Sequence, residues 1–92
     1  MIVRIMGEGQ VRLGEEHLPE LNRLDDELLD EIRNGDGPGF RATLSALLEK
    51  VRELGSPLPD EALEPSELIL PAADATLEEV RALLNDDGLI PG

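Results

Sequence analysis

The start of the chain alternates hydrophobic and polar residues, a pattern that predicts two short β-strands. The first would cover residues 2–6 and the second residues 10–13, while residues 7–9, with glycine at both ends, tolerate the backbone angles of a tight reversal. In such a hairpin, one side carries Val3, Ile5, Val11 and Leu13, and the other carries Arg4, Gln10 and Arg12. Because an isolated hairpin is only marginally stable in water, it must lie on helices or gain a third strand.

Two amphipathic helices are predicted next, because leucine and isoleucine recur there at spacings of three and four residues. The first runs from about residue 15 or 17 to Asn34, where a glycine follows as a stop. The second begins after Asp36, a favourable N-cap residue, and ends at Gly55. Their short connection makes them an antiparallel pair. The side chains expected to face the core are Leu18, Leu21, Leu24, Leu28, Leu29 and Ile32 in the first helix and Phe40, Leu44, Leu47, Leu48, Val51 and Leu54 in the second.

Residues 56–75 contain four prolines and are predicted to be irregular chain. Within this segment, residues 68–70 form a short apolar run between two prolines. The run predicts either a buried strand beside the amino-terminal hairpin or a single turn of helix, and the strand is favoured.

A third helix is predicted from a capping-box sequence at residues 76–79. The Thr76 hydroxyl would accept a hydrogen bond from the Glu79 N–H, and the Glu79 carboxylate would accept one from the Thr76 N–H. The helix would end at Gly88, and the apolar tail of residues 89–91 would tuck against the body. Its inward side chains would be Leu77, Val80, Leu83 and Leu84.

The expected fold class is therefore α+β and mainly helical, with three helices and a small antiparallel β element. That element is the amino-terminal hairpin, to which a third short strand near residues 67–70 can be added. Residues 1–92 would form a single domain. Its core is expected to be thin, because the apolar residues are aliphatic apart from Phe40, the only aromatic residue. Marginal stability, or support from a partner, follows.

The absence of cysteine removes both a disulfide framework and a thiolate metal site, and favours the interior of the cell. The first residues lack the basic region, the longer apolar stretch and the cleavage site of a signal peptide. No segment approaches the roughly 20 apolar residues that span a bilayer. We expect a soluble, cytoplasmic protein that reaches the inner face of the membrane only through a partner.

The net charge is strongly negative, with 21 acidic and 8 basic side chains and a formal charge of -13. The acidic residues concentrate in residues 15–34 and 56–92, whereas residues 1–14 and 35–55 are nearly neutral. Such a charge repels nucleic acid and anionic lipid, so neither is an expected direct partner. Two acidic surfaces are expected instead, provided that these segments are solvated.

The densest acidic cluster lies in the first helix, over residues 25–31. Asp26 and Asp30 are one helical turn apart and could hold a hard cation, but a convex helix face offers too few ligands, so a solvated or partner-facing surface is favoured. Asp86 and Asp87 lack the remaining ligands of a calcium loop. No metal is therefore expected.

The sequence offers no catalytic constellation. His17 and Glu20 have the spacing of one helical turn, but the chain has a single histidine, so a surface histidine at the helix entry is favoured. The serine and threonine hydroxyls have no base in prospect. The basic residues that could form a nucleic-acid surface lack aromatic stacking partners and are instead assigned to solvated faces. They are Arg4, Arg12, Arg41, Lys50 and Arg52. We therefore expect no enzyme activity and no cofactor.

Several segments of the chain resemble the PspAA family of PspA-associated proteins. They are residues 1–10 (MIVRIMGEGQ), 24–26 (LDD), 57–60 (PLPD), 65–71 (PSELILP), 75–80 (ATLEEV) and 87–92 (DGLIPG). The resemblance extends over essentially the whole chain, apart from the glycine-rich connection at residues 35–39. It implies a small, largely helical accessory domain that occurs with PspA-type phage-shock proteins and is linked to envelope stress. PspA itself is a coiled-coil protein that remodels membranes.

The expected function is that of a non-catalytic acidic adaptor, which binds a PspA-type protein or its regulators and modulates the envelope stress response. Complementary charge would speed and orient its docking on a basic partner. One alternative is an acidic mimic of the phosphate backbone that occupies a regulator of transcription. A homodimer formed through the near-neutral hairpin or the second helix is another. The residues expected to dock are Asp25, Asp26, Asp30 and Glu31 in the first helix and Glu78, Asp86 and Asp87 near the end.

Overall fold

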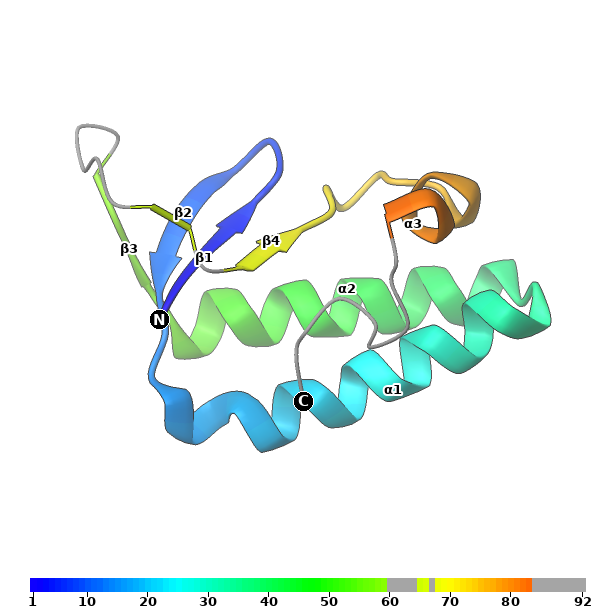
Figure 1. The fold of residues 1–92 in the computed structure, drawn as a ribbon, viewed down its shortest axis with the longest axis horizontal. Coiled ribbons are helices and arrows are strands. Elements are labelled where there is room, and N and C mark those ends of the chain that lie inside the picture. The colour runs from blue at the N-terminus through cyan, green and yellow to red at the C-terminus, as the bar shows by residue number, and fades with distance from the viewer. Residues whose placement is uncertain (60–64, 67, 84–92) are drawn as a thin grey trace.

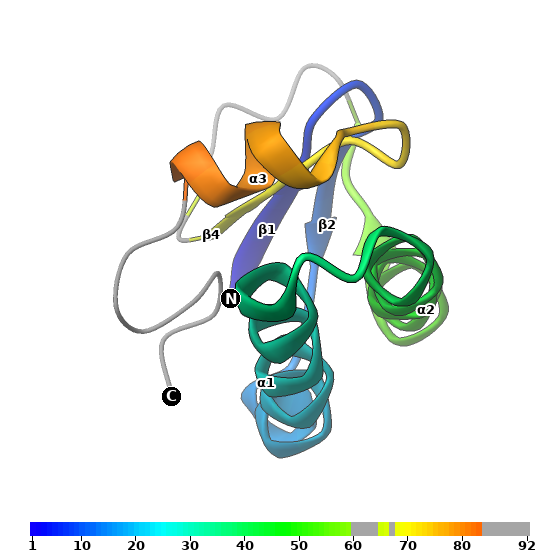
Figure 2. The same ribbon diagram turned by 90° about the vertical axis from the view of Figure 1, so that its right-hand side faces the viewer.

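The structure is a computed structural model that describes residues 1–59, 65–66 and 68–83. In this part of the chain, a sheet lies against two long helices, α1 (Leu18–Asn34) and α2 (Gly37–Leu54) (Figure 1). Figure 2 shows the two helices next to each other beneath one face of the sheet. The layered α+β fold and the antiparallel helix pair are therefore confirmed.

The sheet has four strands in the order β3-β2-β1-β4. Strands β1 and β2 form the predicted antiparallel hairpin, in which Val3 is paired with Val11. Strand β4 runs parallel to β1, with Arg4 next to Ile69, so the strand interpretation of residues 68–70 is confirmed. The sheet is mixed, because this outer pairing is parallel. The strands are β1 (Ile2–Ile5), β2 (Gly9–Arg12), β3 (Ser56–Pro57) and β4 (Leu68–Leu70).

Strand β3 lies in a segment that the sequence predicts to be irregular. Ser56 pairs with Arg12 and Pro57 with Val11, and the Leu58 N–H donates to the Gln10 carbonyl at 3.0 Å. Two residues are too few to show a period-2 pattern, and proline is tolerated here because an edge strand does not need every N–H. The hairpin thus gains a neighbour on each side.

The connection between α1 and α2 follows the predicted capping signals. A short 3-10 turn (Glu15–His17) leads into α1, which ends at Gly35. Gly35 has a φ of 69°, in the left-handed region that glycine adopts without the Cβ clash of other residues. The carboxylate of Asp36 then accepts a hydrogen bond from the Gly39 N–H at 3.1 Å and caps α2.

Helix α3 (Leu77–Leu83) begins at the predicted capping box. The Thr76 N–H donates to the Glu79 carboxylate and the Glu79 N–H to the Thr76 hydroxyl, each at 3.1 Å. Val80 is buried, and Arg81 donates to the carbonyl of Ile32 at 2.7 Å, which ties α3 to the last turn of α1. The structure describes neither the side chain of Leu83 nor the predicted features at Leu84, Gly88 and residues 89–91.

The core is one cluster between the sheet and the helices, which confirms that the leucine stripes face inward. Leu29 is partly exposed and does not belong to it. Met1, Val11, Leu18, Leu24, Leu54, Ala75 and Leu77 pack against the cluster from its margin. Its buried members are Val3, Ile5, Leu13, Leu21, Leu28, Ile32, Phe40, Leu44, Leu47, Leu48, Val51, Leu68, Leu70 and Val80.

Candidate partner-docking surface

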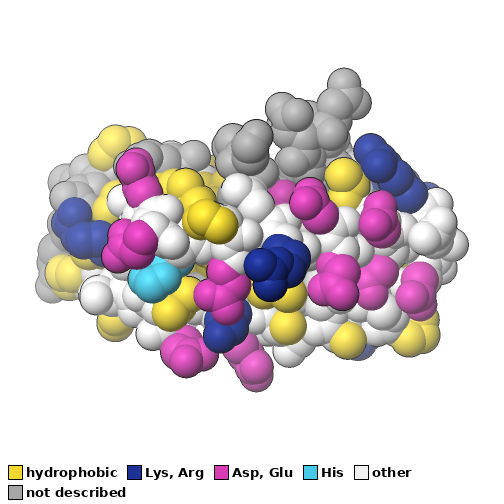
Figure 3. Space-filling model, turned by 90° about the horizontal axis from the view of Figure 1, so that it is seen from below, with side chains coloured by type: hydrophobic (Ala, Val, Ile, Leu, Met, Phe, Trp, Pro, Cys, Tyr) yellow, Lys and Arg dark blue, Asp and Glu magenta, His cyan; other side chains and the backbone are white. Residues whose placement is uncertain are grey.

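The outward side of α1 carries a set of exposed carboxylates. Asp26, Glu27 and Asp30 are all exposed, and Asp26 and Asp30 are separated by one helical turn. Figure 3, which views the molecule from the side of α1 and α2, shows acidic side chains over both halves of this face, with basic side chains among them. Because these groups project into water, they form a negative surface that a basic partner can reach.

Asp25 does not contribute to this surface, although the sequence groups it with Asp26. Its side chain is 3% exposed and lies in the buried stripe of α1 that also contains Leu21 and Leu28. Successive residues on a helix are about 100° apart, so two neighbouring aspartates point in clearly different directions. The spacing of four residues from Leu21 and three from Leu28 is the sequence signal that places Asp25 inward.

Glu31 is only partly exposed and lies at the junction of α1 and α2. One of its carboxylate oxygens lies at Gly39 in the first turn of α2, so close that a Cβ atom added there would displace the carboxylate. The other oxygen, Oε1, is buried without a hydrogen-bond partner in the described part of the chain. The helix dipole favours a negative charge at this end of α2, whose N-cap hydrogen bond is accepted by Asp36.

The remaining predicted docking residues are in the last third of the chain. Glu78 is exposed in the first turn of α3. It lines an open depression together with residues from the start of α2, among them Pro38 and Arg41. Asp86 and Asp87 lie outside the described residues. Glu78 therefore belongs to a different helix from the exposed carboxylates of α1.

A shallow groove of about 290 Å³ runs between α1 and α2 on the side away from the sheet. Leu24 and Ala46 line it, and charged side chains surround them. The Lys50 ammonium lies 3.2 Å from Glu20 and 4.0 Å from Glu53. The hydrogen bond to Glu20, and then the charges of both carboxylates, raise the pKa of Lys50. The groove lining thus mixes both signs of charge, with three glutamates beside Arg23 and Lys50.

His17 lies at the entry to α1, and its Nε2 atom is 3.8 Å from Glu16. Glu20, one turn later, is instead paired with Lys50. Within residues 1–59, 65–66 and 68–83, no group of three or more histidine, aspartate or glutamate side chains could hold a metal ion. None of the helices in those ranges has the length and apolar character needed to cross a bilayer.

The turn of the β1–β2 hairpin is tied to α2 by an ion pair between Glu8 and Arg52. Arg52 donates from Nε to Glu8 Oε1 at 2.8 Å and from a second nitrogen to Oε2. The hydrogen bond from Arg52, and secondarily its positive charge, lower the pKa of Glu8. Of the basic residues predicted to be surface groups, Arg52 and Lys50 therefore have carboxylate partners.

Replacing Arg52 with alanine is expected to raise the pKa of Glu8 to its ordinary value, as measured by NMR titration. Because the folded-state pKa is lowered, the pair stabilises the fold above the unfolded-state pKa, and this stabilisation is lost as the pH falls through the folded-state value. The loss of stability at pH 7 should be at most about 1 kcal/mol, since both side chains are solvated. Arg41→Ala is the control, and a Glu8 pKa that stays low in Arg52→Ala would contradict the assignment.

These observations define the class of protein: a small, acidic α+β protein in which two helices cover one face of a mixed sheet. The family model described as PspA-Associated protein, PspAA, matches residues 1–92, and the chain therefore belongs to this family. No curated protein and no solved structure matches the chain.

Proposed function

We propose that this protein is a non-catalytic adaptor that associates with a PspA-type membrane-stress protein and modulates the envelope, or phage-shock, stress response. The observation that carries the proposal is the family match over residues 1–92, because the family is described by its association with PspA. In this proposal, residues 1–92 act as a single cytoplasmic domain that reaches the membrane only through its partner.

The proposed contact surface is the exposed carboxylate set on α1, represented by Asp26 and Asp30, with Glu78 on α3 as a further contact. A formal charge of -13 attracts a basic partner over a distance and orients the encounter. At contact, a charge pair about 4 Å apart is worth about 1 kcal/mol in water and about 4 kcal/mol near a protein surface. Asp25 is left out of this surface because it is buried.

The test is co-purification with the cognate PspA at micromolar concentration in about 0.15 M salt. The double variant Asp26→Lys/Asp30→Lys is expected to weaken association at least about tenfold, because two attractive contacts become repulsive. Raising the salt concentration should weaken binding of the unchanged protein in the same direction.

The matched control is Glu15→Lys/Asp74→Lys, which reverses two other exposed carboxylates. Each double variant changes two residues by +2, so both carry a formal charge of -9 instead of -13. Equal weakening by both variants would make the effect one of net charge and contradict docking on α1. The absence of any association with PspA would contradict direct binding altogether.

The same experiment addresses the alternative roles. Retention of a DNA-binding regulator in place of PspA on the immobilised protein would favour a mimic of the phosphate backbone. Light scattering at two protein concentrations would detect a homodimer, because the average molecular mass in solution would rise with concentration.

A further inference from the structure

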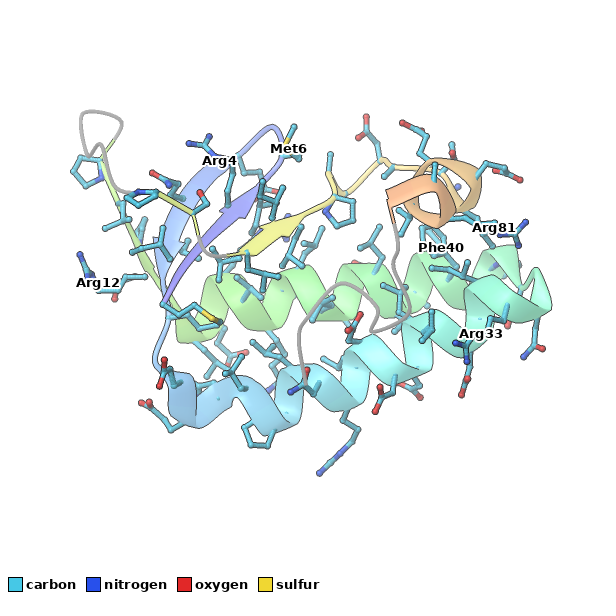
Figure 4. The ribbon with its side chains drawn as sticks, in the orientation of Figure 1. Arg4, Met6, Arg12, Arg33, Phe40 and Arg81 are labelled. Atoms are coloured by element: carbon cyan, nitrogen blue, oxygen red, sulfur yellow. The ribbon has the colours of Figure 1, made fainter. Side chains whose placement is uncertain are left out.

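The face of the sheet opposite α1 and α2 combines a basic side chain with exposed hydrophobic side chains. Register places Gln10 of β2, Arg4 of β1 and Ile69 of β4 in one row across three strands. Met6 follows Arg4 by two residues and comes directly after the end of β1. Figure 4 shows Arg4 and Met6 on the side of the sheet that faces away from both long helices.

This face carries the large hydrophobic side chains that are exposed in the described part of the chain. Met6 is 49% exposed and Ile69 is 57% exposed, although Leu68 and Leu70 on either side of Ile69 are buried. Exposed apolar side chains that lie together commonly mark an interaction site, whereas isolated ones need no explanation. Here the two flank the same basic side chain, Arg4. We call Arg4, Met6 and Ile69 the Arg4 patch.

The charge at the patch is opposite to that of the whole protein. Arg4 is exposed and forms no ion pair within residues 1–59, 65–66 and 68–83. Arg52, by contrast, is bound to Glu8, the one carboxylate of residues 1–14. Among the residues that the structure describes, nothing takes up the donors of the Arg4 guanidinium, which can bind a carboxylate with two parallel hydrogen bonds.

We propose that the Arg4 patch is a second docking surface, which binds a short segment of a partner protein that presents a carboxylate beside apolar side chains. The carboxylate pairs with Arg4, and the apolar side chains cover Met6 and Ile69. This inference goes beyond the proposed function, because the carboxylates on α1 suit a basic partner and lie on a different face. One molecule can then contact two partners of opposite charge.

The net charge of the protein and the small exposed area of the Arg4 patch argue against a polyanion, a membrane or a second copy of the chain as its occupant. A long polyanion or an anionic membrane is repelled by the formal charge of -13, whereas a short segment with one or two carboxylates is not strongly repelled. A two-fold contact between copies would bring two unpaired Arg4 side chains together. Two half-exposed side chains also fall far short of the roughly 800 Å² per partner of a stable interface, so the contact is weak.

The test uses NMR titration of the full chain with two 12-residue peptides that share the same leucines and differ only at two polar positions, which carry either glutamate or lysine. We expect the glutamate peptide to shift the backbone amide signals of Arg4, Met6 and Ile69, with a Kd on the order of 100 μM. The lysine peptide should instead shift signals in α1, near Asp26 and Asp30.

Arg4→Glu is expected to weaken binding of the glutamate peptide about tenfold, because attraction becomes repulsion. Ile69→Thr, which keeps a β-branched residue in the strand, should weaken it about threefold through lost apolar contact. The control is Arg33→Glu, an exposed arginine at the end of α1 that Figure 4 shows far from Arg4. Both arginine variants carry a formal charge of -15, so long-range repulsion is matched.

Three results would overturn the proposal. The first is that the lysine peptide shifts the patch signals as strongly as the glutamate peptide. Another is equal weakening by Arg33→Glu and Arg4→Glu. The third is a change in the patch signals on dilution of the chain alone, which would identify a second copy as the occupant. None of these results depends on whether PspA binds to α1.

Discussion

Replacing Phe40 with alanine is expected to lower the free energy of unfolding by about 3–5 kcal/mol. Phe40 is 2% exposed, and its ring is the only aromatic group in the chain. It belongs to the same buried cluster as Val80, so it joins the start of α2 to the side of the molecule where α3 lies (Figure 4). Truncation removes the apolar transfer energy and leaves a cavity that aliphatic neighbours fill only in part.

This loss is large because a small domain has about 5–15 kcal/mol of stability in total. If the unchanged protein has a stability at the lower end of this range, Phe40→Ala should be largely unfolded before urea is added. Urea denaturation followed by circular dichroism measures the loss. The control is Phe40→Leu, which keeps an apolar side chain and should cost less than half as much. A Phe40→Ala variant as stable as the control would show that the ring is not part of the core.

The variant Leu70→Ala is expected to destabilise the protein by about 2–4 kcal/mol. Leu70 is 0% exposed and lies in β4, where its carbonyl accepts a hydrogen bond from the Met6 N–H at 3.0 Å. A strand of three residues at the edge of a sheet contributes few hydrogen bonds, so the buried leucines supply most of its attachment.

The matched control for Leu70 is its neighbour Ile69, which is 57% exposed. Ile69→Ala should cost no more than about 0.5 kcal/mol, the usual range for surface positions. Urea unfolding of both variants measures the difference. Equal losses would mean that residues 68–70 do not alternate between the core and the solvent, and would contradict both the strand and the exposure of the Arg4 patch.

The sequence allowed the helices and the hairpin to be predicted because their signals are local. The spacing of leucines along α1 and α2 repeats over several turns, and each end carries a residue with a specific backbone role, such as Gly35 or Asp36. The capping box at Thr76 and Glu79 is equally local. In these segments, local propensity and final packing agree.

The candidate site was predictable only in part. Exposure of Asp26 and Asp30 follows from the helical pattern, but grouping Asp25 with them treated sequence neighbours as spatial neighbours. Glu31 illustrates a different difficulty, because its contact with Gly39 depends on how the α1–α2 connection turns. The Arg4 patch requires β4 to lie beside β1, and Ile69 is 65 residues from Arg4 in sequence, 69 minus 4.

The sequence by itself determined where helices form, which of their sides is apolar and how strongly negative the protein is. These properties depend on residue types and on spacings within a few turns. Only the tertiary structure decided the strand order, the parallel pairing of β4, the presence of β3 and the position of Arg4 beside Ile69. Strand partners are far apart in the chain, and a strand of two or three residues is stabilised by its neighbours rather than by its own sequence.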